Sequence, residues 1–215
     1  MNLKEHHITV QRTARYYTAG TLNENTKEIW FVVHGWAQLA GSFLQNFEAL
    51  QNENRFFIAP EALNRFYLKG GFSEVGATWM TKEDREAEIN DYVNYLENLY
   101  TELMDGKISA DTKITVLGFS QGVTTVSRWV HQTQKHIDRL IFYAGEPAAE
   151  LQNAESLQAI SKAENYYFYG NEDRIISKEK LEPFKALLPQ FQFIEFEGKH
   201  EVKGDVLAGF FKYMV

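Results

Sequence analysis

The fold of this chain is decided by Ile114-Thr115-Val116-Leu117-Gly118-Phe119-Ser120-Gln121-Gly122, a G-x-S-x-G pentapeptide that follows an apolar run. The run predicts a strand, and the apolar spacing after the pentapeptide predicts a helix, through Val123, Val126 and Val130. A serine between such elements lies on a sharp turn at the positive end of the helix. We therefore predict that Ser120 is a nucleophile. The alternative is an ordinary loop in which Ser120 caps the helix.

The two glycines of the pentapeptide have a steric role in this interpretation. On so tight a turn, the residues two before and two after the serine approach each other's backbone. Gly118 and Gly122 remove the side chains that would collide there.

A serine hydroxyl needs a base that takes its proton, and in this arrangement an acid and then a histidine follow the serine in the chain. Asp173 comes just after the aromatic run 166–169, and His200 comes just after the alternating segment 191–196. Both runs predict strands, so both side chains lie in loops at the carboxyl edge of a sheet. We expect His200 to exchange the proton with Ser120, and Asp173 to orient the imidazole and stabilise its charged form.

The sequence contains other acids and histidines that are candidates for these roles. Glu146 follows the strand predicted at 139–144, and Glu172 is the neighbour of Asp173, so both are alternative acids. The remaining histidines fit a solvated terminus or an exposed helix face better than catalysis: His6, His7, His131 and His136. We expect His34 to brace its loop through a hydrogen bond and not to transfer protons.

His34 opens a second motif, His34-Gly35-Trp36, directly after the apolar run 29–33. Serine attack creates a negative oxygen, and backbone N–H groups aimed at this oxygen give large rate effects. We predict that the N–H groups of Trp36 and Gln121 form this oxyanion hole, with Gly35 allowing close approach. The alternative for Trp36 is a core tryptophan at the base of a loop.

Together these motifs resemble the α/β-hydrolase superfamily and, within it, the phospholipase/carboxylesterase group that includes the acyl-protein thioesterases. Four blocks carry the resemblance: His34-Gly35-Trp36, Gly118-Phe119-Ser120-Gln121-Gly122, Gly170-Asn171-Glu172-Asp173-Arg174-Ile175-Ile176 and Gly198-Lys199-His200. The resemblance marks Asp173 as the acid. It implies a serine esterase or thioesterase that cleaves short to medium acyl chains through an acyl-enzyme, without a metal or organic cofactor.

The chain departs from the group's usual pattern at several places. The group usually carries a Gly-Asp pair where this chain has Ala37-Gln38, and a second glycine at the position of Val123. It also favours histidine at the position of Tyr169 and proline at that of Ser177. No catalytic group is lost, but the substrate stays open. A peptidase, a phospholipase, a carbon–carbon hydrolase and a non-catalytic binding module with the same fold are the alternatives.

The chain alternates strand and helix patterns, which predicts one α/β domain over 1–215 with a mostly parallel sheet and helices on both faces. Strands are predicted near 7–11, 15–19, 29–33, 56–59, 114–117, 139–144, 166–170 and 191–196. Apolar stripes predict helices over 43–50, 89–103, 181–188 and 206–214. The first two strands are expected to pair as an antiparallel edge, because their link is too short for a parallel crossover.

The interval of about 60–84 contains aromatic residues among glycines with no clean period. Such an insertion after a sheet strand is typical of a lid or a pocket wall. We predict that Phe72 and Trp79 line an acyl pocket there. The alternative is that both rings pack the insertion against the body.

Composition narrows the classes of partner. The net charge is −7 with no clustered basic face, which excludes nucleic acid as an expected partner. Cysteine is absent, so disulfides and thiolate sites are excluded. The N-terminal residues form no apolar signal segment and no run reaches membrane-spanning length, so we expect a cytoplasmic enzyme. The expected partner is a small-molecule ester or thioester, and the oligomeric state stays open.

Overall fold

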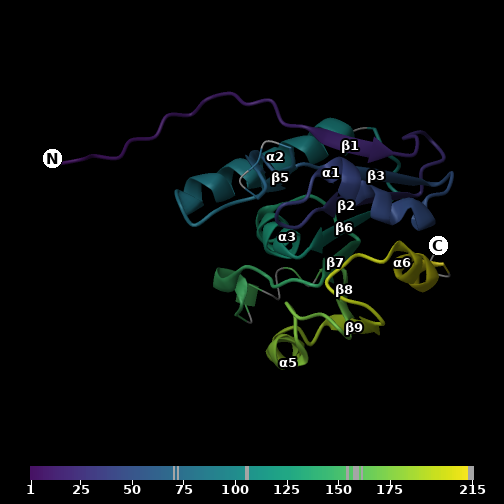
Figure 1. Ribbon diagram of the computed structural model, residues 1–215. Helices are drawn as coiled ribbons and strands as arrows, with labels where there is room; N and C mark the ends of the chain where they lie inside the picture. The colour runs from purple at the N-terminus through teal and green to yellow at the C-terminus, as the bar shows by residue number, and fades with distance from the viewer. Residues whose placement is uncertain are drawn as a thin grey trace.

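The computed structural model describes residues 1–69, 71, 73–104, 107–153, 155–156, 160 and 162–212, in which a seven-stranded sheet is the central layer (Figure 1). The strand order is β1-β3-β2-β6-β7-β8-β9. Its strands are β1 (Tyr16–Ala19), β2 (Glu28–Val33), β3 (Arg55–Pro60), β6 (Lys113–Phe119), β7 (Arg139–Tyr143), β8 (Glu164–Gly170) and β9 (Phe191–Phe196). Every neighbouring pair is parallel except β1 and β3. The predicted mostly parallel sheet with an antiparallel N-terminal edge is confirmed.

The pairing of that edge differs from the expectation. Residues 7–11 form no strand, and β1 pairs instead with β3, with Tyr16 opposite Pro60. Side chains of residues 1–13 are exposed, so the alternating pattern there has no apolar face to bury against the sheet. Arg12 fastens this segment by donating to the carbonyl of Leu63 and to the side chain of Asn64.

Helices cover both faces of the sheet (Figure 1). One face carries α2 (Arg85–Met104), α3 (Gln121–Gln132) and α5 (Lys178–Leu187), and the other carries α1 (Ala40–Leu44), η1 (Gln45–Leu50) and α6 (Gly204–Phe211). A short turn, η2 (Ala149–Leu151), follows β7. The predicted helix at 206–214 is observed up to Phe211, and Met214 lies outside the described residues. Among the described residues, no helix combines the length and the apolar character that crossing a bilayer requires.

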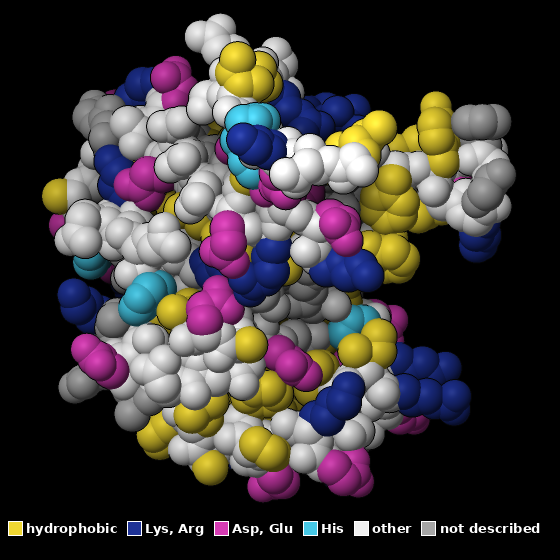
Figure 2. Space-filling model, turned by 90° about the vertical axis from the view of Figure 1, so that its left-hand side faces the viewer, with side chains coloured by type: hydrophobic (Ala, Val, Ile, Leu, Met, Phe, Trp, Pro, Cys, Tyr) yellow, Lys and Arg dark blue, Asp and Glu magenta, His cyan; other side chains and the backbone are white. Residues whose placement is uncertain are grey.

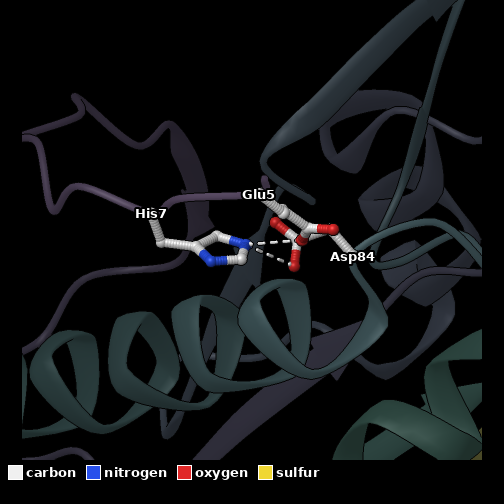
Figure 3. Close-up of side chains that lie close together, drawn as sticks. All are labelled: Glu5, His7 and Asp84. Carbon is white, nitrogen blue, oxygen red and sulfur yellow. Dashed lines mark hydrogen bonds and ion pairs between the residues drawn. The ribbon is translucent and has the colours of Figure 1, made fainter. Parts of the chain in front are cut away.

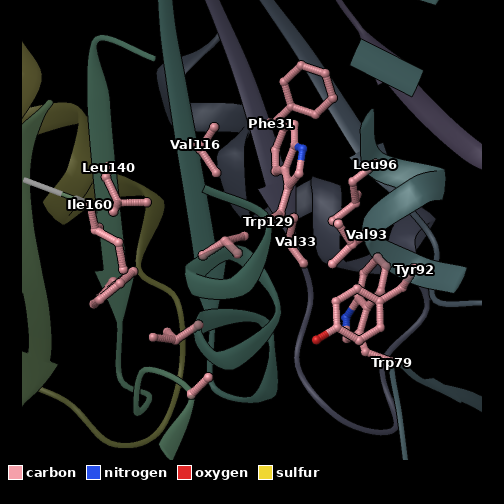
Figure 4. Packing of buried hydrophobic residues seen from close by; sticks show 14 of the residues in the cluster. Phe31, Val33, Trp79, Tyr92, Val93, Leu96, Val116, Trp129, Leu140 and Ile160 are labelled. Carbon is pink, nitrogen blue, oxygen red and sulfur yellow. The ribbon is translucent and has the colours of Figure 1, made fainter. Parts of the chain in front are cut away.

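Two hydrophobic cores lie on the two faces, and β2 serves both because its side chains alternate between them. Ile29, Phe31 and Val33 belong to the core under α2, α3 and α5, whereas Trp30 and Val32 belong to the other core. Figure 4 shows Phe31 and Trp129 packed together on the first face. Every residue of β2 is buried, which is typical of a central strand in a parallel sheet.

The interval 60–84 contains a two-stranded antiparallel hairpin, β4 (Asn64–Tyr67) and β5 (Val75–Thr78). Four-residue strands are too short for their alternation to stand out among the aromatic residues, so the sequence pattern does not reveal them. β5 also forms a bridge to Gln38 through Ala77. A Cβ atom on Gly76 would lie 2.5 Å from the carbonyl oxygen of Ala37, so only glycine allows this close approach.

Candidate active site

Ser120 lies on the sharp turn between β6 and α3, with φ of 52° and ψ of −118°. Positive φ is strained for a residue with a side chain, and such strain concentrates at functional positions. A Cβ atom on Gly118 would lie 2.4 Å from the carbonyl oxygen of Gly122, and one on Gly122 would lie 2.2 Å from that of Val33. The glycines therefore have the steric role that the pentapeptide suggested.

The structure brings Ser120, His200 and Asp173 together, although 80 residues separate the serine from the histidine. The Ser120 hydroxyl lies 2.9 Å from His200 Nε2, and His200 Nδ1 lies 2.7 Å from Asp173 Oδ2. The side chain of His200 is 19% exposed, whereas that of Asp173 is fully buried. The arrangement allows the hydroxyl to donate to Nε2 while Nδ1–H donates to the carboxylate.

Asp173 is held by its own loop after β8. Its second oxygen, Oδ1, accepts the backbone N–H groups of Ile175 at 2.7 Å and Ile176 at 2.9 Å. Both carboxylate oxygens are thus occupied, which fixes the carboxylate plane against the imidazole. The alternative acids, Glu146 and Glu172, are exposed and make no hydrogen bond to His200 in the part of the chain that the structure describes.

His34 is buried and joins two loops near the turn. Its Nδ1 donates to the carbonyl of Gly35 at 2.7 Å, and its Nε2 accepts the N–H of Ala62 at 3.0 Å. Burial lowers the pKa of His34 to about 4, so the ring is neutral near pH 7. The expected bracing hydrogen bond of His34 is confirmed. The remaining histidines are exposed: His6, His7, His131 and His136.

The two predicted oxyanion donors flank the nucleophile. A Cβ atom on Gly35 would lie 3.1 Å from Cβ of Ser120, so this loop packs directly against the serine. Among the described residues, the backbone N–H groups of Trp36 and Gln121 make no hydrogen bond. Two unpaired N–H groups beside a serine can donate hydrogen bonds to a developing negative oxygen.

Of Phe72 and Trp79, the two aromatic residues predicted to line an acyl pocket, the structure describes only Trp79. Trp79 is 1% exposed, and its indole donates to the carbonyl of His34 at 2.9 Å within the core. It offers no surface to a ligand in this structure, which corrects the prediction for Trp79: the alternative, packing against the body, describes it. Phe72 lies outside the described residues.

Trp36 is not a core tryptophan, because 61% of it is exposed. Its ring lies 5.6 Å from that of Phe66 on β4, a residue that the sequence interpretation did not single out. Gln38 was noted only as a departure from the group's pattern, yet its Oε1 accepts the N–H of Gly35 at 2.8 Å. Gln38 follows His34 by four positions, and this closeness to the His34-Gly35-Trp36 motif is the sequence feature that could have indicated its role.

Figure 2 shows one face of the molecule, on which hydrophobic side chains of a projecting lobe border a hollow. Among the described residues, the large exposed hydrophobic side chains outside the N-terminal segment and β1 are Trp36, Tyr67 and Ile175. Two of these belong to the loops already described: Trp36 carries a candidate oxyanion donor, and Ile175 follows Asp173 by two positions. Apolar surface therefore lies on the loops that surround the serine.

One group of described residues could hold a metal ion. Glu5, His7 and Asp84 each offer one ligand atom, and these atoms lie within 4.8 Å of one another (Figure 3). All three side chains are exposed, and His7 Nε2 lies 3.0 Å from Asp84 and 3.3 Å from Glu5. The arrangement is that of a histidine between two carboxylates, and it ties the N-terminal segment to the start of α2.

The sequence and the structure were compared with known proteins. A family profile described as "Serine hydrolase (FSH1)" matches residues 31–203. No curated protein sequence matches the chain. Solved structures with the same fold include Zea mays acyl-protein thioesterase 2, which is 18% identical with a TM-score of 0.66 over 94% of this chain and 98% of that one.

Two further structures show the same likeness. Esterase PE8 is 16% identical, with a TM-score of 0.67 over 95% of this chain and 100% of that one. Arabidopsis thaliana SOBER1 is 13% identical, with a TM-score of 0.66 over 86% and 96%. The TM-scores and the coverage show that this chain has the α/β-hydrolase fold.

Proposed function

Because the chain belongs to the FSH1 serine hydrolase family, we propose that it cleaves carboxylic esters or thioesters of short to medium acyl chains through an acyl-enzyme at Ser120. One observation carries the proposal: two consecutive hydrogen bonds, of 2.9 Å and 2.7 Å, join Ser120 through His200 to Asp173. This order of groups is the one that activates a serine hydroxyl.

In the first half of the reaction, Ser120 Oγ attacks the carbonyl carbon while its proton passes to His200 Nε2. The bond between Oγ and carbon forms as the carbonyl π electrons move onto the oxygen. Asp173 keeps the imidazole in the tautomer that leaves Nε2 free to accept the proton, and it stabilises the imidazolium. The buried position of this carboxylate makes the interaction stronger than it would be in water.

The oxyanion accepts hydrogen bonds from the N–H groups of Trp36 and Gln121, which have no other partner among the described residues. Each such donor contributes about 10²- to 10³-fold to the rate. Gln121 is also the first residue of α3, so the positive end of this helix acts on the same oxygen.

Collapse of the tetrahedral intermediate expels the alcohol or thiol, which takes the proton from His200 Nε2. Water then enters, gives a proton to His200 and attacks the acyl carbon. The second intermediate releases the carboxylic acid and returns the proton to Ser120. The 19% exposure of the His200 side chain is compatible with access of this water.

The apolar surface around the serine supports an apolar acyl group. The ring of Trp36 packs against that of Phe66 in a tilted arrangement, and Ile175 is 53% exposed on the loop of Asp173. We place β4 and β5 as a pocket wall on this side, because β5 is bridged to the Trp36 loop at Gln38. Two proteins of similar structure are named as an acyl-protein thioesterase and an esterase, which supports the same substrate class.

A fluorophosphonate probe tests the proposal. The native protein is expected to be labelled covalently, and Ser120→Ala is expected to abolish labelling and to lower kcat by about 10⁶. Absence of labelling in the native protein would instead support a binding module. A loss below tenfold in Ser120→Ala would contradict the role of Ser120.

The substrate class is tested with p-nitrophenyl esters and acyl-CoA thioesters of graded length. A maximum of kcat/KM at short to medium acyl chains is expected. Turnover restricted to peptides or phospholipids would replace the ester assignment while leaving the serine mechanism in place.

A further inference from the structure

We infer that Gln38 and Gln121 are positioning residues that hold both oxyanion donors against strand β5. The carboxamide of Gln121 bonds the end of β5 directly, whereas Gln38 bonds Gly35 with its carboxamide and β5 with its backbone. This inference rests on the proposed serine mechanism. Neither carboxamide makes a hydrogen bond to Ser120 or His200 among the described residues, and the inference assigns the hairpin a role in the geometry of the oxyanion hole.

Gln121 has two separate parts in the site. Its backbone N–H is one candidate oxyanion donor, whereas its side chain turns to the end of β5. There Nε2 donates to the Thr78 hydroxyl at 3.0 Å and to the Met80 carbonyl at 3.1 Å, while Oε1 accepts the Trp79 N–H at 3.2 Å. Thr78 and Trp79 are buried, so water competes little for these bonds.

Gln38 joins the same strand to the other donor. Its backbone carbonyl accepts the N–H of Ala77 at 3.2 Å, and the Ala77 carbonyl accepts the N–H of Ala37 at 2.9 Å. Its side-chain Oε1 accepts the N–H of Gly35 at 2.8 Å. The loop that carries Trp36 is therefore fixed to β5 by the two backbone bonds to Ala77, and it is braced internally by the bond between Gln38 and Gly35.

These bonds settle the direction of the Trp36 donor. The peptide between Gly35 and Trp36 is planar and trans, so its C=O and N–H point in opposite directions. The carbonyl of Gly35 accepts hydrogen bonds from His34 Nδ1 and from the N–H of Gln38. The Trp36 N–H consequently lies on the opposite side of this peptide, where no described residue bonds it.

β5 is thus a shared frame for two donors that belong to different loops. β5 and the loop of Trp36 approach each other closely because Gly76 lacks a Cβ atom and Ala37 has a positive φ of 65°. A displacement of about 1 Å in a catalytic group can cost about 10²-fold in rate. Loosening either glutamine should therefore lower kcat even though both backbone donors remain.

The test replaces each glutamine by methionine, which has a similar length and no comparable hydrogen-bonding group. Gln121→Met and Gln38→Met are expected to lower kcat by about 10- to 100-fold, with KM within about twofold. Gln38→Glu keeps an acceptor at the Gly35 N–H and should recover most of the loss. Gln132→Met, an exposed substitution at the end of the same helix α3, is the matched control and should leave kcat unchanged.

A coupling measurement separates positioning from general destabilisation. Thr78→Val removes one partner of Gln121, so Gln121→Met combined with Thr78→Val should cost less than the sum of the two single losses in log kcat. Additive losses, or a kcat that falls only as the folded fraction falls, would overturn the inference. Unchanged kcat in both methionine variants, with Ser120→Ala inactive, would overturn it while leaving the proposed function intact.

Discussion

The two ends of the central sheet carry two different clusters of charged or polar side chains. At the amino ends, the first residues of four strands form ion pairs: Glu28 of β2 binds Arg55 of the neighbouring β3 and, across β6, Arg139 of β7, and Arg139 also binds Glu164 of β8. The strand register places Glu28 beside Arg55 and Arg139 beside Glu164. Glu28, Arg55 and Arg139 are at most 7% exposed.

At the carboxyl ends, the loops bring together a serine, a histidine and an aspartate. Beside them, the backbone N–H groups of Trp36 and Gln121 bond to no residue that the structure describes. The amino-end cluster is closed, since each buried charge faces an opposite charge. The carboxyl-end cluster differs, because two backbone N–H groups beside it have no bonding partner among the described residues. The comparison teaches that the same buried strands carry two kinds of polar cluster. In the cluster at the amino ends, charges pair with one another and stabilise the fold. Beside the cluster at the carboxyl ends, N–H groups without a partner among the described residues can bind a reacting group.

The largest expected effect in this comparison comes from the carboxyl end. Asp173→Asn keeps the shape of the side chain but favours the wrong tautomer of His200, so kcat should fall by about 10⁴-fold. Steady-state kinetics measure this loss. Glu172→Gln, one position away and exposed, is the matched control, and an equal loss in both variants would reassign the acid.

The amino end should respond in stability and not in turnover. Glu28→Gln leaves two buried arginines without their shared carboxylate and is expected to lower the free energy of unfolding by about 3–5 kcal/mol. Glu164→Gln is the control, because this glutamate is 57% exposed and its pair should contribute at most about 1 kcal/mol. Denaturant unfolding measures both, and kcat per folded molecule should stay at the native value. A tenfold change in kcat would mean that the two ends are coupled.

Dependence on pH should distinguish the ends further. Burial depresses the pKa of His34 to about 4, so the unfolded chain binds its proton first as pH falls. The contribution of His34 is therefore complete above about pH 6.5 and is lost toward pH 4, on the order of 3 kcal/mol. Unfolding curves between pH 7 and pH 4 should show this slope in the native chain and a flatter one in His34→Gln. Equal slopes would contradict the neutral, buried state of His34.

Glu28 titrates in a lower window. Burial alone would raise its pKa, but hydrogen bonds from Arg55 and Arg139 outweigh burial, so the pKa lies below its usual value. Stability from this carboxylate is present above about pH 4.5 and is lost as pH falls through the lowered pKa. In the same unfolding series, extended to lower pH, Glu28→Gln should therefore show a flatter slope than the native chain below pH 4.5 and an equal slope above it.

The smallest expected effect concerns selectivity. Trp36→Ala keeps the backbone donor but removes the ring that packs against Phe66, so kcat/KM for apolar acyl chains should fall by about 10-fold relative to acetate esters. Tyr67→Ala, an exposed aromatic change on the same hairpin, is the matched comparison and should change this ratio less. A ratio that moves equally in both variants would assign recognition to the hairpin as a whole.

Much of the fold could be predicted from the sequence because strands such as 29–33 are continuous apolar runs and helices such as 89–103 keep a 3.6-residue period. The error at 7–11 arose because alternation is a local signal, whereas a strand needs a neighbour that buries one of its faces. The register of β1 on β3 depends on a contact between distant segments, which no local pattern contains.

The site shows the same division. Ser120, Asp173 and His200 follow recognisable strands, so their loops could be located from the sequence. Trp79 could not be placed, because a tryptophan suits a core and a ligand pocket equally until its exposure is known. Phe66 and Gln38 matter through contacts across loops, which only the three-dimensional arrangement reveals.

The separation of 80 positions between Ser120 and His200 also sets an order of events during synthesis. At the usual pace of translation, about 5–20 residues per second, Ser120 leaves the ribosome roughly 4 to 16 s before His200. A nascent chain therefore carries an unreactive hydroxyl while its first strands assemble. In the proposed mechanism, hydrolytic competence arrives only with the last parallel strand and the loop that follows it.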